Sequence, residues 1–335
     1  MPYPHLFSPI AIGRLELRNR VVMPPMVVNM DAHGAQSREW YAERARGGAG
    51  LVIREGTRTF LFDQPGYADG LRPMVEAVHD AGARVAIQLF VADTVGDETV
   101  DVSAREGARE VTAAEIEAMH ECLARAAAAC QSVGFDAVEP HGAHGFFMNR
   151  FFSPVHNRRT DGYGGSLENR MRFGLAAVQA VRSAVGAGYP ILYRHTPRDG
   201  GDGGYTIEDS RRFCRALVDA GVDVLDVSPS NSGDGPHADM AAAIKQAVPV
   251  PVIAVGSMND PRKAEAALAE GKCDLVAIGR GLIADAHWAA KVSSGREAEI
   301  IECVDCNEKC FGNLRRGLPV GCAQNPESGS EYLRA

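Results

Sequence analysis

Two histidines near the middle of the chain are the first residues whose types and spacing could do chemistry. His141 and His144 stand among glycines in the stretch VEPHGAHGFFMNRFFSP, directly after a strand-like run over residues 135–139. Histidine titrates near neutral pH and both donates and accepts hydrogen bonds, so two of them at a strand's end can grip a ligand oxygen. Each one alone is more often a structural hydrogen-bonding residue.

Four cysteines near the end of the chain form a second candidate site. They follow the pattern C-x2-C-x3-C-x11-C and are Cys303, Cys306, Cys310 and Cys322. Three thiolates within eight positions and a remote fourth can enclose a [4Fe-4S] cluster, to which the short loops offer backbone N–H groups. A structural zinc ion would also accept four thiolates, although zinc more often uses two separated pairs. The other four cysteines are expected in the core.

Length and composition limit the class of protein. The chain has 335 residues, 45% of them hydrophobic, which suits one barrel-sized domain with an appendage. A net charge of -8 argues against a nucleic-acid partner, because phosphate binding needs a basic face. No stretch is long and apolar enough to span a bilayer, and the first residues lack the plan of a signal peptide. We therefore expect a cytoplasmic protein whose clustered cysteines bind a metal rather than form disulfides.

Short β-rich runs alternate with helical patterns along the chain. The candidate strands are residues 20–26, 51–56, 84–89, 137–140, 191–195, 224–228, 252–255 and 275–278. Helical spacing is found between them, for example over residues 72–81, 113–132, 167–185, 210–220 and 261–270. Eight such units favour an α/β fold closed into a (β/α)8 TIM barrel over an open doubly wound sheet. We expect the barrel over residues 1–295 and a cysteine-rich [4Fe-4S] extension over 296–335.

Ligand-binding residues of such a barrel lie where the strands run into the following loops. Gly56 after the second strand lets a flat ligand approach closely. Gln88 at the end of the third strand can give and take hydrogen bonds, although a purely structural glutamine is an alternative. Arg194 on the fifth strand is costly to bury without an anion, an acceptor or a structural carboxylate such as Glu55 or Glu139.

The loops after the seventh and eighth strands indicate a phosphate site. Gly256 and Gly279 free backbone N–H groups beside Ser257, and the guanidinium of Arg280 can fork onto phosphate oxygens. One such loop is a weak indication, because glycine is common at strand-to-helix turns. Two together, on the strands that form the usual barrel phosphate site, favour a phosphorylated ligand.

The stretch HGAHGFFMNRFFSPVHNRRTDGYGGSLENR resembles the signature loop of the old yellow enzyme family of flavin-dependent oxidoreductases. The resemblance runs from about residue 6 to residue 291, because the candidate residues fall in the family's order on the expected strands. It implies FMN as the cofactor, with NAD(P)H as an electron donor. It also implies that His141 and His144 bind the electron-withdrawing group of a small-molecule substrate over the flavin.

The resemblance assigns roles to the other candidates. The backbone at Pro25 and Met26 would lie along the flavin ring, and Gln88 would meet the N3–H and O2 edge of the ring. Arg194 would stabilise the negative charge of the reduced flavin and raise its potential. The glycine loops and Arg280 would hold the FMN phosphate.

The cysteine pattern is similar to the [4Fe-4S] loop of one branch of the family, that of 2,4-dienoyl-CoA reductase and trimethylamine dehydrogenase.

Two features depart from the family. Phe146 stands where members commonly carry a tyrosine that donates a proton to the substrate carbon, and residues 91–109 form a polar stretch expected to be a lid or a loose loop. No G-x-G-x-x-G motif for dinucleotide binding follows a strand. Three sources of electrons are therefore expected as alternatives: a separate reductase or electron-transfer protein, direct hydride delivery to FMN, or further domains that a truncated chain would lack.

These features favour an ene-reductase that reduces the C=C bond of an α,β-unsaturated carbonyl or enoyl thioester. One alternative is a flavin-dependent dehydrogenase that oxidises an amine or a C–H bond and passes electrons out through the cluster. Another is an electron-transfer subunit of a larger complex. Association into a homo-oligomer is expected by analogy of fold alone.

Overall fold

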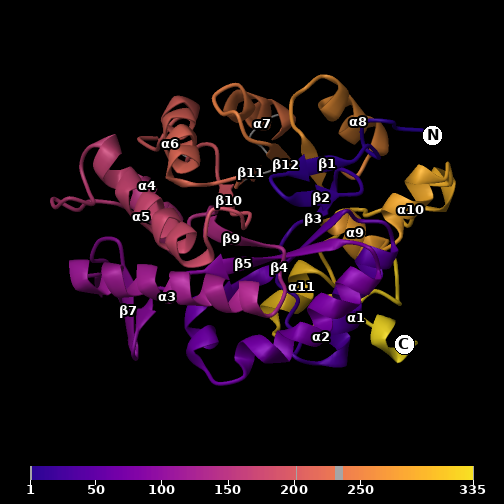
Figure 1. Ribbon diagram of the computed structural model, residues 1–335, viewed down its shortest axis with the longest axis horizontal. Helices are drawn as coiled ribbons and strands as arrows, with labels where there is room; N and C mark the ends of the chain where they lie inside the picture. Colours follow the sequence, from indigo (N-terminus) through magenta and orange to yellow (C-terminus); the bar gives the residue numbers. More distant parts are fainter. Residues whose placement is uncertain (1, 201, 231–236, 335) are drawn as a thin grey trace.

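Eight parallel strands close into a barrel at the centre of the computed structural model, which describes residues 2–200, 202–230 and 237–334 (Figure 1). In chain order the barrel strands are β3 (Val21–Met23), β4 (Leu51–Arg58), β5 (Arg84–Phe90), β9 (Ala137–Gly142), β10 (Leu192–His195), β11 (Val224–Val227), β12 (Val252–Val255) and β13 (Leu275–Ala277). Each predicted strand overlaps one of these eight. The prediction of a TIM barrel is confirmed.

Helices surround the barrel, as crossover connections between parallel strands require. They include α1 (Ala35–Arg46), α2 (Tyr67–Asp80), α3 (Ala113–Ser132), α5 (Leu167–Val185), α6 (Ile207–Ala220), α7 (His237–Lys245) and α8 (Pro261–Ala269). Helices α3 and α5 have the predicted bounds, and α3 begins with a capping box between Thr112 and Glu115. In the described parts of the chain, no helix has the length and apolar character needed to cross a membrane.

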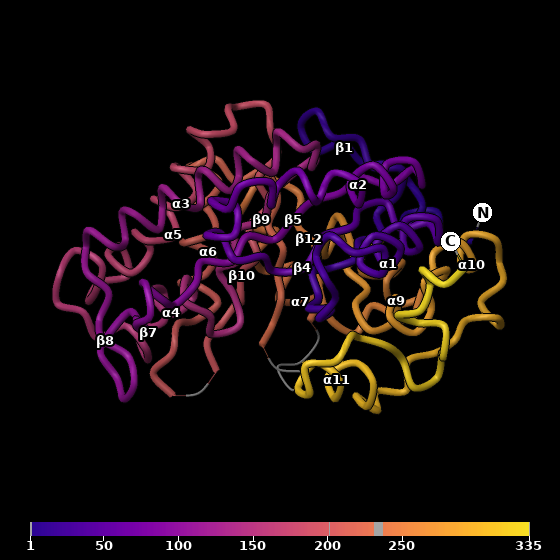
Figure 2. Tube along the Cα trace, turned by 90° about the horizontal axis from the view of Figure 1, so that it is seen from below, coloured from indigo at the N-terminus to yellow at the C-terminus, as the bar shows by residue number. Residues whose placement is uncertain are grey.

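A hairpin closes the amino-terminal end of the barrel. It consists of β1 (Ile10–Ile12) and β2 (Leu15–Leu17), and its apolar side chains join the cluster that fills the barrel interior. In Figure 2 the hairpin lies at the upper edge, whereas β7 (Glu98–Asp101), α4 (Phe147–Phe152) and α11 (Phe311–Arg315) lie toward the lower edge. The two ends of the barrel therefore have separate roles, and the loops that follow the strands gather opposite the hairpin.

The barrel interior changes from apolar to polar along the strands. Its apolar part includes Ala86, Ala137, Leu192 and Val224. Side chains two positions apart on a strand point to the same side, so the next inward positions are polar. We call this set the polar layer, and it consists of Gln88, Glu139, Arg194 and Asp226, all buried.

The segment after β5 is not a loose loop. It forms a small sheet of β6 (Thr94–Val95), β7 and β8 (Arg109–Glu110). Val100 and Val102 are buried beneath it, and the Asp101 carboxylate accepts a 2.7 Å hydrogen bond from Arg150. Two buried valines and a partly buried ion pair hold this polar stretch in place, and its composition alone did not reveal these contacts.

The carboxyl-terminal segment, described over residues 296–334, packs along the barrel beside α9 (Arg280–Ala284) and α10 (Trp288–Ser293) (Figure 2). Val320 N donates to Val28 O at 2.9 Å, and Ser328 Oγ donates to Ile283 O at 2.6 Å. A buried ion pair joins Arg44 of α1 to Glu331, with 2.6 Å between Nη1 and Oε1. These contacts hold the cysteine loop, residues 303–322, at the end of the barrel where the loops gather.

Candidate active site

The two histidines lie side by side at the carboxyl end of β9. Their ring centroids are 5.3 Å apart, and His141 is buried. His144 adopts a left-handed backbone conformation with φ of 60°, and its N–H donates to Thr196 Oγ1 at 2.9 Å. The strand itself thus positions His141, and the tight turn after it brings His144 beside it at the carboxyl end of the barrel.

Both imidazoles are neutral at physiological pH. Burial lowers the pKa of His144 to about 3, and the positive charge of Arg194 acts in the same direction. Burial, with His144 and Arg194 nearby, also holds the pKa of His141 well below its usual value. A neutral imidazole keeps one N–H donor, so the pair is suited to an uncharged carbonyl oxygen rather than to a carboxylate.

Ser228 connects His144 to Arg194 of the polar layer. His144 Nε2 lies 2.8 Å from Ser228 Oγ, and Arg194 Nη2 donates to the same oxygen at 3.0 Å. A guanidinium can only donate, so it uses one lone pair of the hydroxyl and leaves the O–H free to donate to the imidazole. That arrangement would place the ring N–H of His144 on Nδ1.

Gln88 is oriented by Glu139. Gln88 Nε2 donates to Glu139 Oε1 at 2.8 Å, which leaves Gln88 Oε1 as an acceptor. This oxygen would lie 3.0 Å from a Cβ built at Gly56, so glycine is the residue that leaves it room. The amide therefore presents a carbonyl to an N–H donor, such as one on the edge of a flat heterocycle.

Arg194 pairs with Asp226, and not with Glu55 or Glu139 as the sequence suggested for a structural ion pair. Arg194 Nη1 is 3.6 Å from Asp226 Oδ2, because Arg194 and Asp226 are register partners on β10 and β11. Glu55 is engaged elsewhere, since its Oε2 accepts a 2.7 Å hydrogen bond from Val28 N. Strand register, which the sequence does not show, decides the partner.

A pocket of about 210 Å³ lies beside these residues. Seven of the nine predicted cofactor-binding residues line it: Pro25, Met26, Arg194, Gly256, Ser257, Gly279 and Arg280. Gly56 and Gln88 are not in this lining.

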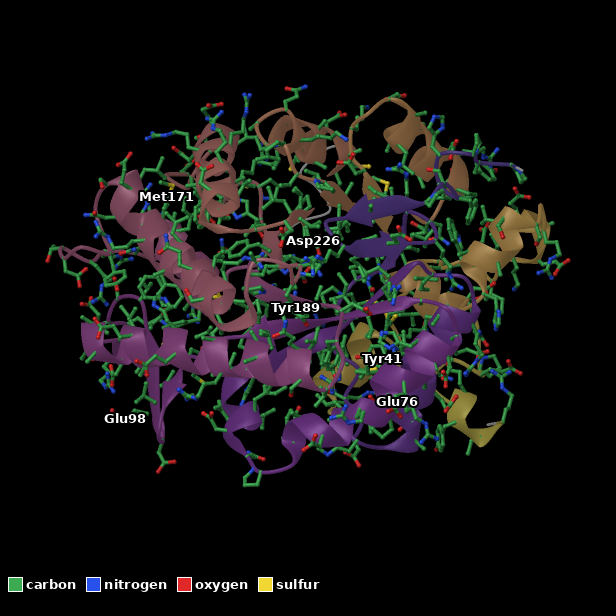
Figure 3. All side chains as sticks on the ribbon, in the orientation of Figure 1. Tyr41, Glu76, Glu98, Met171, Tyr189 and Asp226 are labelled. Atoms are coloured by element: carbon green, nitrogen blue, oxygen red, sulfur yellow. The ribbon has the colours of Figure 1, made fainter. Side chains whose placement is uncertain are left out.

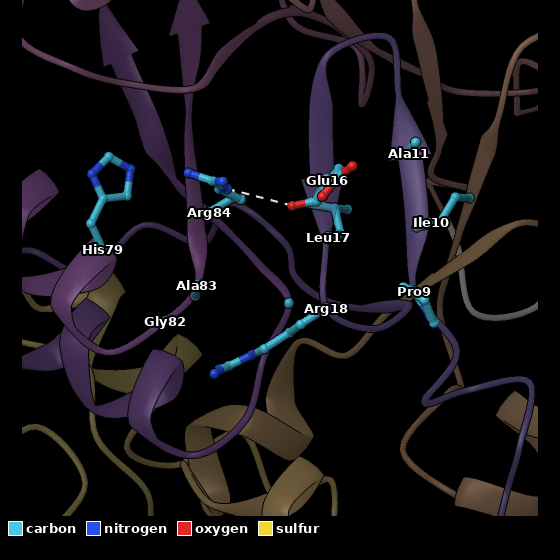
Figure 4. A pocket seen from close by; sticks show the side chains of 11 residues that line it. Pro9, Ile10, Ala11, Glu16, Leu17, Arg18, His79, Gly82, Ala83 and Arg84 are labelled. Atoms are coloured by element: carbon cyan, nitrogen blue, oxygen red, sulfur yellow. Dashed lines mark hydrogen bonds between the residues drawn. The ribbon is translucent and has the colours of Figure 1, made fainter.

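A larger hollow of about 680 Å³ lies at the other end of the barrel beside the hairpin, where Arg84 reaches toward Glu16 O (Figure 4). The hollow at that end contains neither histidine of the pair.

The pocket residues fit a flavin mononucleotide. Gly256 and Ser257 have left-handed φ of 106° and 57°, and a Cβ at Gly256 would clash with His237 Nδ1, so a larger residue there would displace this ring. Arg194 Nε is buried without an acceptor among the described residues, as expected for a group that awaits a ligand atom. The glycine turns could bind the phosphate of FMN. Arg194 and, outside the lining of this pocket, the Gln88 carbonyl could bind its ring.

Arg280 lies between the pocket and the cysteine loop. Its Nη1 is 2.7 Å from Asp305 Oδ1 and donates to Asn307 Oδ1 at 3.1 Å. Both partners have left-handed backbone conformations, with φ of 55° and 59°. The predicted phosphate ligand thus also contacts the loop that carries Cys303 and Cys306.

The cysteine loop carries four thiols of the type that binds an iron–sulfur cluster, but these thiols do not converge on one position. Cys306 is exposed, and Cys303, Cys310 and Cys322 are partly buried. Gly321 N donates to Lys309 O at 3.0 Å, which ties the chain before Cys322 to the chain before Cys310. Within residues 2–200, 202–230 and 237–334, no three His, Cys, Asp or Glu side chains converge on one metal position. The thiol donors fit a cluster by type and spacing.

Phe146 forms an aromatic wall beside the histidines. Its ring centroid is 5.2 Å from His141 and 5.0 Å from Phe90, and 44% of the residue is exposed. The hydroxyl groups of Tyr205 and Tyr193, on the neighbouring elements, do not replace the hydroxyl that Phe146 lacks. Tyr205 Oη donates to Thr196 O at 3.0 Å, and the buried Tyr193 packs against Phe213 among the helices.

Sequence reasoning missed Ser228, Asp226 and His237. Alternation along the sixth strand could have revealed the first two. Val224 points into the barrel, and Asp226 and Ser228 follow it two and four positions later, on the same side of the strand. His237 had no such signal, since only the folded chain brings its ring to Gly256.

Comparison with known proteins identifies the family. Residues 5–299 match the NADH:flavin oxidoreductase / NADH oxidase family, and the chain belongs to this family of flavin-dependent oxidoreductases. The chain is 38% identical to an NADH oxidase of Thermoanaerobacter brockii, over 98% of this chain and 57% of the relative.

Solved structures give the same result. A 2-naphthoyl-CoA reductase complex superposes with a TM-score of 0.93 at 29% identity, over 98% of this chain and 58% of that one. Histamine dehydrogenase from Rhizobium sp. 4-9 gives a TM-score of 0.89 at 26% identity, over 98% and 53%. The chain therefore spans little more than half the length of these proteins. The match covers 98% of the 335 residues, and 13 residues follow Cys322. Because the uncovered part is shorter than these 13 residues, the matched region extends past all four loop cysteines.

Removal of the Ser228 hydroxyl tests the link between His144 and Arg194. In the FMN-loaded protein we expect Ser228→Ala to weaken binding of benzaldehyde about tenfold, because a buried hydrogen-bonding group without its partner costs about 1–3 kcal/mol. Binding is measured through the change in the visible spectrum of the flavin. In the parent protein the affinity should be constant from pH 5 to pH 9, since His144, with a pKa of about 3, stays neutral throughout.

Ser210→Ala is the matched control. Ser210 Oγ lies 2.8 Å from His195 Nε2 in a fully buried serine–histidine pair on the outer side of the barrel wall. It should leave benzaldehyde affinity unchanged. Equal effects of the two substitutions, or a titration of the parent affinity near pH 6.5, would contradict the role given to Ser228.

Proposed function

We propose that this chain is the flavin-binding catalytic part of an ene-reductase, which reduces the C=C bond of an α,β-unsaturated carbonyl or enoyl thioester. FMN would be bound in the pocket beside the polar layer, and NAD(P)H would supply the electrons. The observation that carries the proposal is the pair of imidazoles, 5.3 Å apart, at the carboxyl end of a barrel strand, where burial lowers the pKa of both.

The protein residues would act on the substrate through its oxygen. FMN, when bound, supplies hydride chemistry between the nicotinamide and the substrate. Hydrogen bonds from His141 and His144 would draw electron density toward the carbonyl oxygen, which makes the β carbon more electrophilic. Gln88 and Arg194 would hold the cofactor edge, and Gly256, Ser257, Gly279 and Arg280 its phosphate. Phe146 has no proton to give, so the proton for the α carbon would come from water.

We also propose that the cysteine loop holds a [4Fe-4S] cluster through Cys303, Cys306, Cys310 and Cys322. The donor set and spacing support this, and so does the similarity that extends through the loop to longer relatives. Such a cluster would exchange single electrons with a further domain or a separate electron-transfer protein. Arg280, which contacts both the pocket and Asp305, would lie between the two centres.

The opposite direction is a second candidate. An oxidation of an amine or C–H bond needs no proton donor at the position of Phe146, and a histamine dehydrogenase is among the similar structures. In that case electrons would leave through the cluster.

Anaerobic half-reactions separate the two directions. We expect NAD(P)H to bleach the flavin and cyclohexenone to restore its colour, whereas histamine should leave it unchanged. The Phe146→Tyr variant should restore the colour at least tenfold faster than the parent, because general acid catalysis contributes about 10²–10⁴-fold. Phe146→Leu, which adds no hydroxyl, is the control. Bleaching by the amine without reoxidation by the enone would favour the oxidative alternative.

Iron content tests the cluster. We expect purification without oxygen to give four irons per chain if all four cysteines bind a single cubane cluster. Cys322→Ser should lower the iron content and keep FMN, while Cys122→Ser, a partly buried cysteine beside Asp63, should keep both. A colourless protein with one zinc ion per chain would contradict the cluster.

A further inference from the structure

Two buried carboxyl groups lie next to each other in the polar layer. Glu139 of β9 and Asp226 of β11 are both 0% exposed, and their strands flank β10, which carries Arg194. Figure 3 labels Asp226 near the centre of the molecule, within the ring of helices. The sequence suggested Glu139 only as a structural partner of Arg194 and gave Asp226 no role.

These carboxyl groups have too few donors for two negative charges. Glu139 Oε1 accepts from Gln88, and Asp226 Oδ2 is 3.6 Å from Arg194 Nη1. Glu139 Oε2 and both oxygens of Asp226 have no hydrogen-bond donor among the described residues. Two carboxylates beside one guanidinium would leave one negative charge uncompensated in the barrel interior, which is strongly unfavourable.

A single proton resolves this deficit. Burial raises the pKa of Glu139 well above its usual value, the charge of Asp226 raises it further, and a protonated Glu139 can donate to Asp226. Burial also raises the pKa of Asp226, but Arg194 and the hydrogen bond from Glu139 oppose that rise. The proton therefore belongs on Glu139, and the negative charge stays on Asp226 next to Arg194.

We propose that Glu139 and Asp226 hold one proton between them, on Glu139, so that ionised Asp226 neutralises Arg194 and keeps the bound flavin a strong electron donor. The inference rests on the proposed function, since it concerns the cofactor that Arg194 would face. An arginine alone would stabilise negative charge on the reduced ring and raise its potential. A carboxylate 3.6 Å from the guanidinium offsets that effect through a weakly screened interaction.

This assignment makes Asp226 a residue that tunes the cofactor through Arg194, and Glu139 the residue that keeps Asp226 oriented. Glu139 also fixes Gln88, so one neutral carboxyl group serves both partners: its carbonyl oxygen accepts from the amide and its O–H donates to Asp226. The same hydrogen bonds can be made by a glutamine side chain. Lower potential favours delivery of electrons to an alkene over removal of electrons from a substrate.

The test compares midpoint potentials of bound FMN in three forms of the full chain: the parent, Glu139→Gln, and the double variant Glu139→Gln/Asp226→Asn. We expect the parent value in Glu139→Gln, because a neutral amide replaces a neutral acid. In the double variant we expect a shift to higher potential, because Arg194 is then left without a carboxylate. The surface substitution Asp219→Asn on α6 should have no effect.

Two results would overturn the proposal. A raised potential in Glu139→Gln means that both groups are ionised in the parent, and an unchanged potential in the double variant means that Asp226 does not compensate Arg194. Infrared spectroscopy of the FMN-free protein gives a second, independent readout. The band of a protonated carboxylic acid should be present in the parent and absent in Glu139→Gln, and its absence from the parent would refute the shared proton. This readout holds even if the chain binds no FMN, which separates failure of the inference from failure of the proposed function.

Discussion

The structure of the site depends on one buried charge, the guanidinium of Arg194. A cation inside a barrel must be compensated, and the register of β10 against β11 supplies Asp226 as the counter-ion. The remaining hydrogen bonds follow from this pair. Arg194 also donates to Ser228, which contacts His144, and the second carboxyl group beside Asp226 orients Gln88. The predicted substrate-binding His144 and the predicted cofactor-binding Arg194 and Gln88 thus belong to one connected network.

This network occupies the level where the barrel stops being filled by apolar side chains. Below it, Ala137, Leu192 and their neighbours form a packed core that the hairpin closes. Above it, the glycine loops after β12 and β13 and the cysteine loop surround the pocket. The carboxyl-terminal segment is held to the barrel by backbone bonds and by the buried Arg44–Glu331 pair, so it can keep Arg280 in contact with Asp305. The apolar core, the polar layer and the pocket therefore follow one another along the barrel, and the cysteine loop forms part of the pocket wall.

The sequence predicted what depends on local pattern. The eight strands and the two longest helices follow from periodicity, and His141 and His144 from a motif. It failed where the answer depends on closure of the barrel. The partner of Arg194 was sought at Glu55 and Glu139, although strand register supplies Asp226, and the ring of His237 reaches Gly256 only in the folded chain. Outside the barrel, the expectation of a loose loop after β5 was wrong, because the polar composition of that stretch conceals the buried Val100 and Val102.

Calorimetric titration of the flavin-free chain with FMN and with riboflavin tests the central claim most directly. Gln88 and Arg194 would offer an acceptor and a cation to the flavin ring, and the glycine turns with Arg280 would offer donors to a phosphate. We therefore expect one FMN per chain and at least tenfold weaker binding of riboflavin, because charge-assisted hydrogen bonds to a phosphate are about twice as strong as neutral ones. No binding of FMN, or equal affinity for the two flavins, would contradict the cofactor site described here.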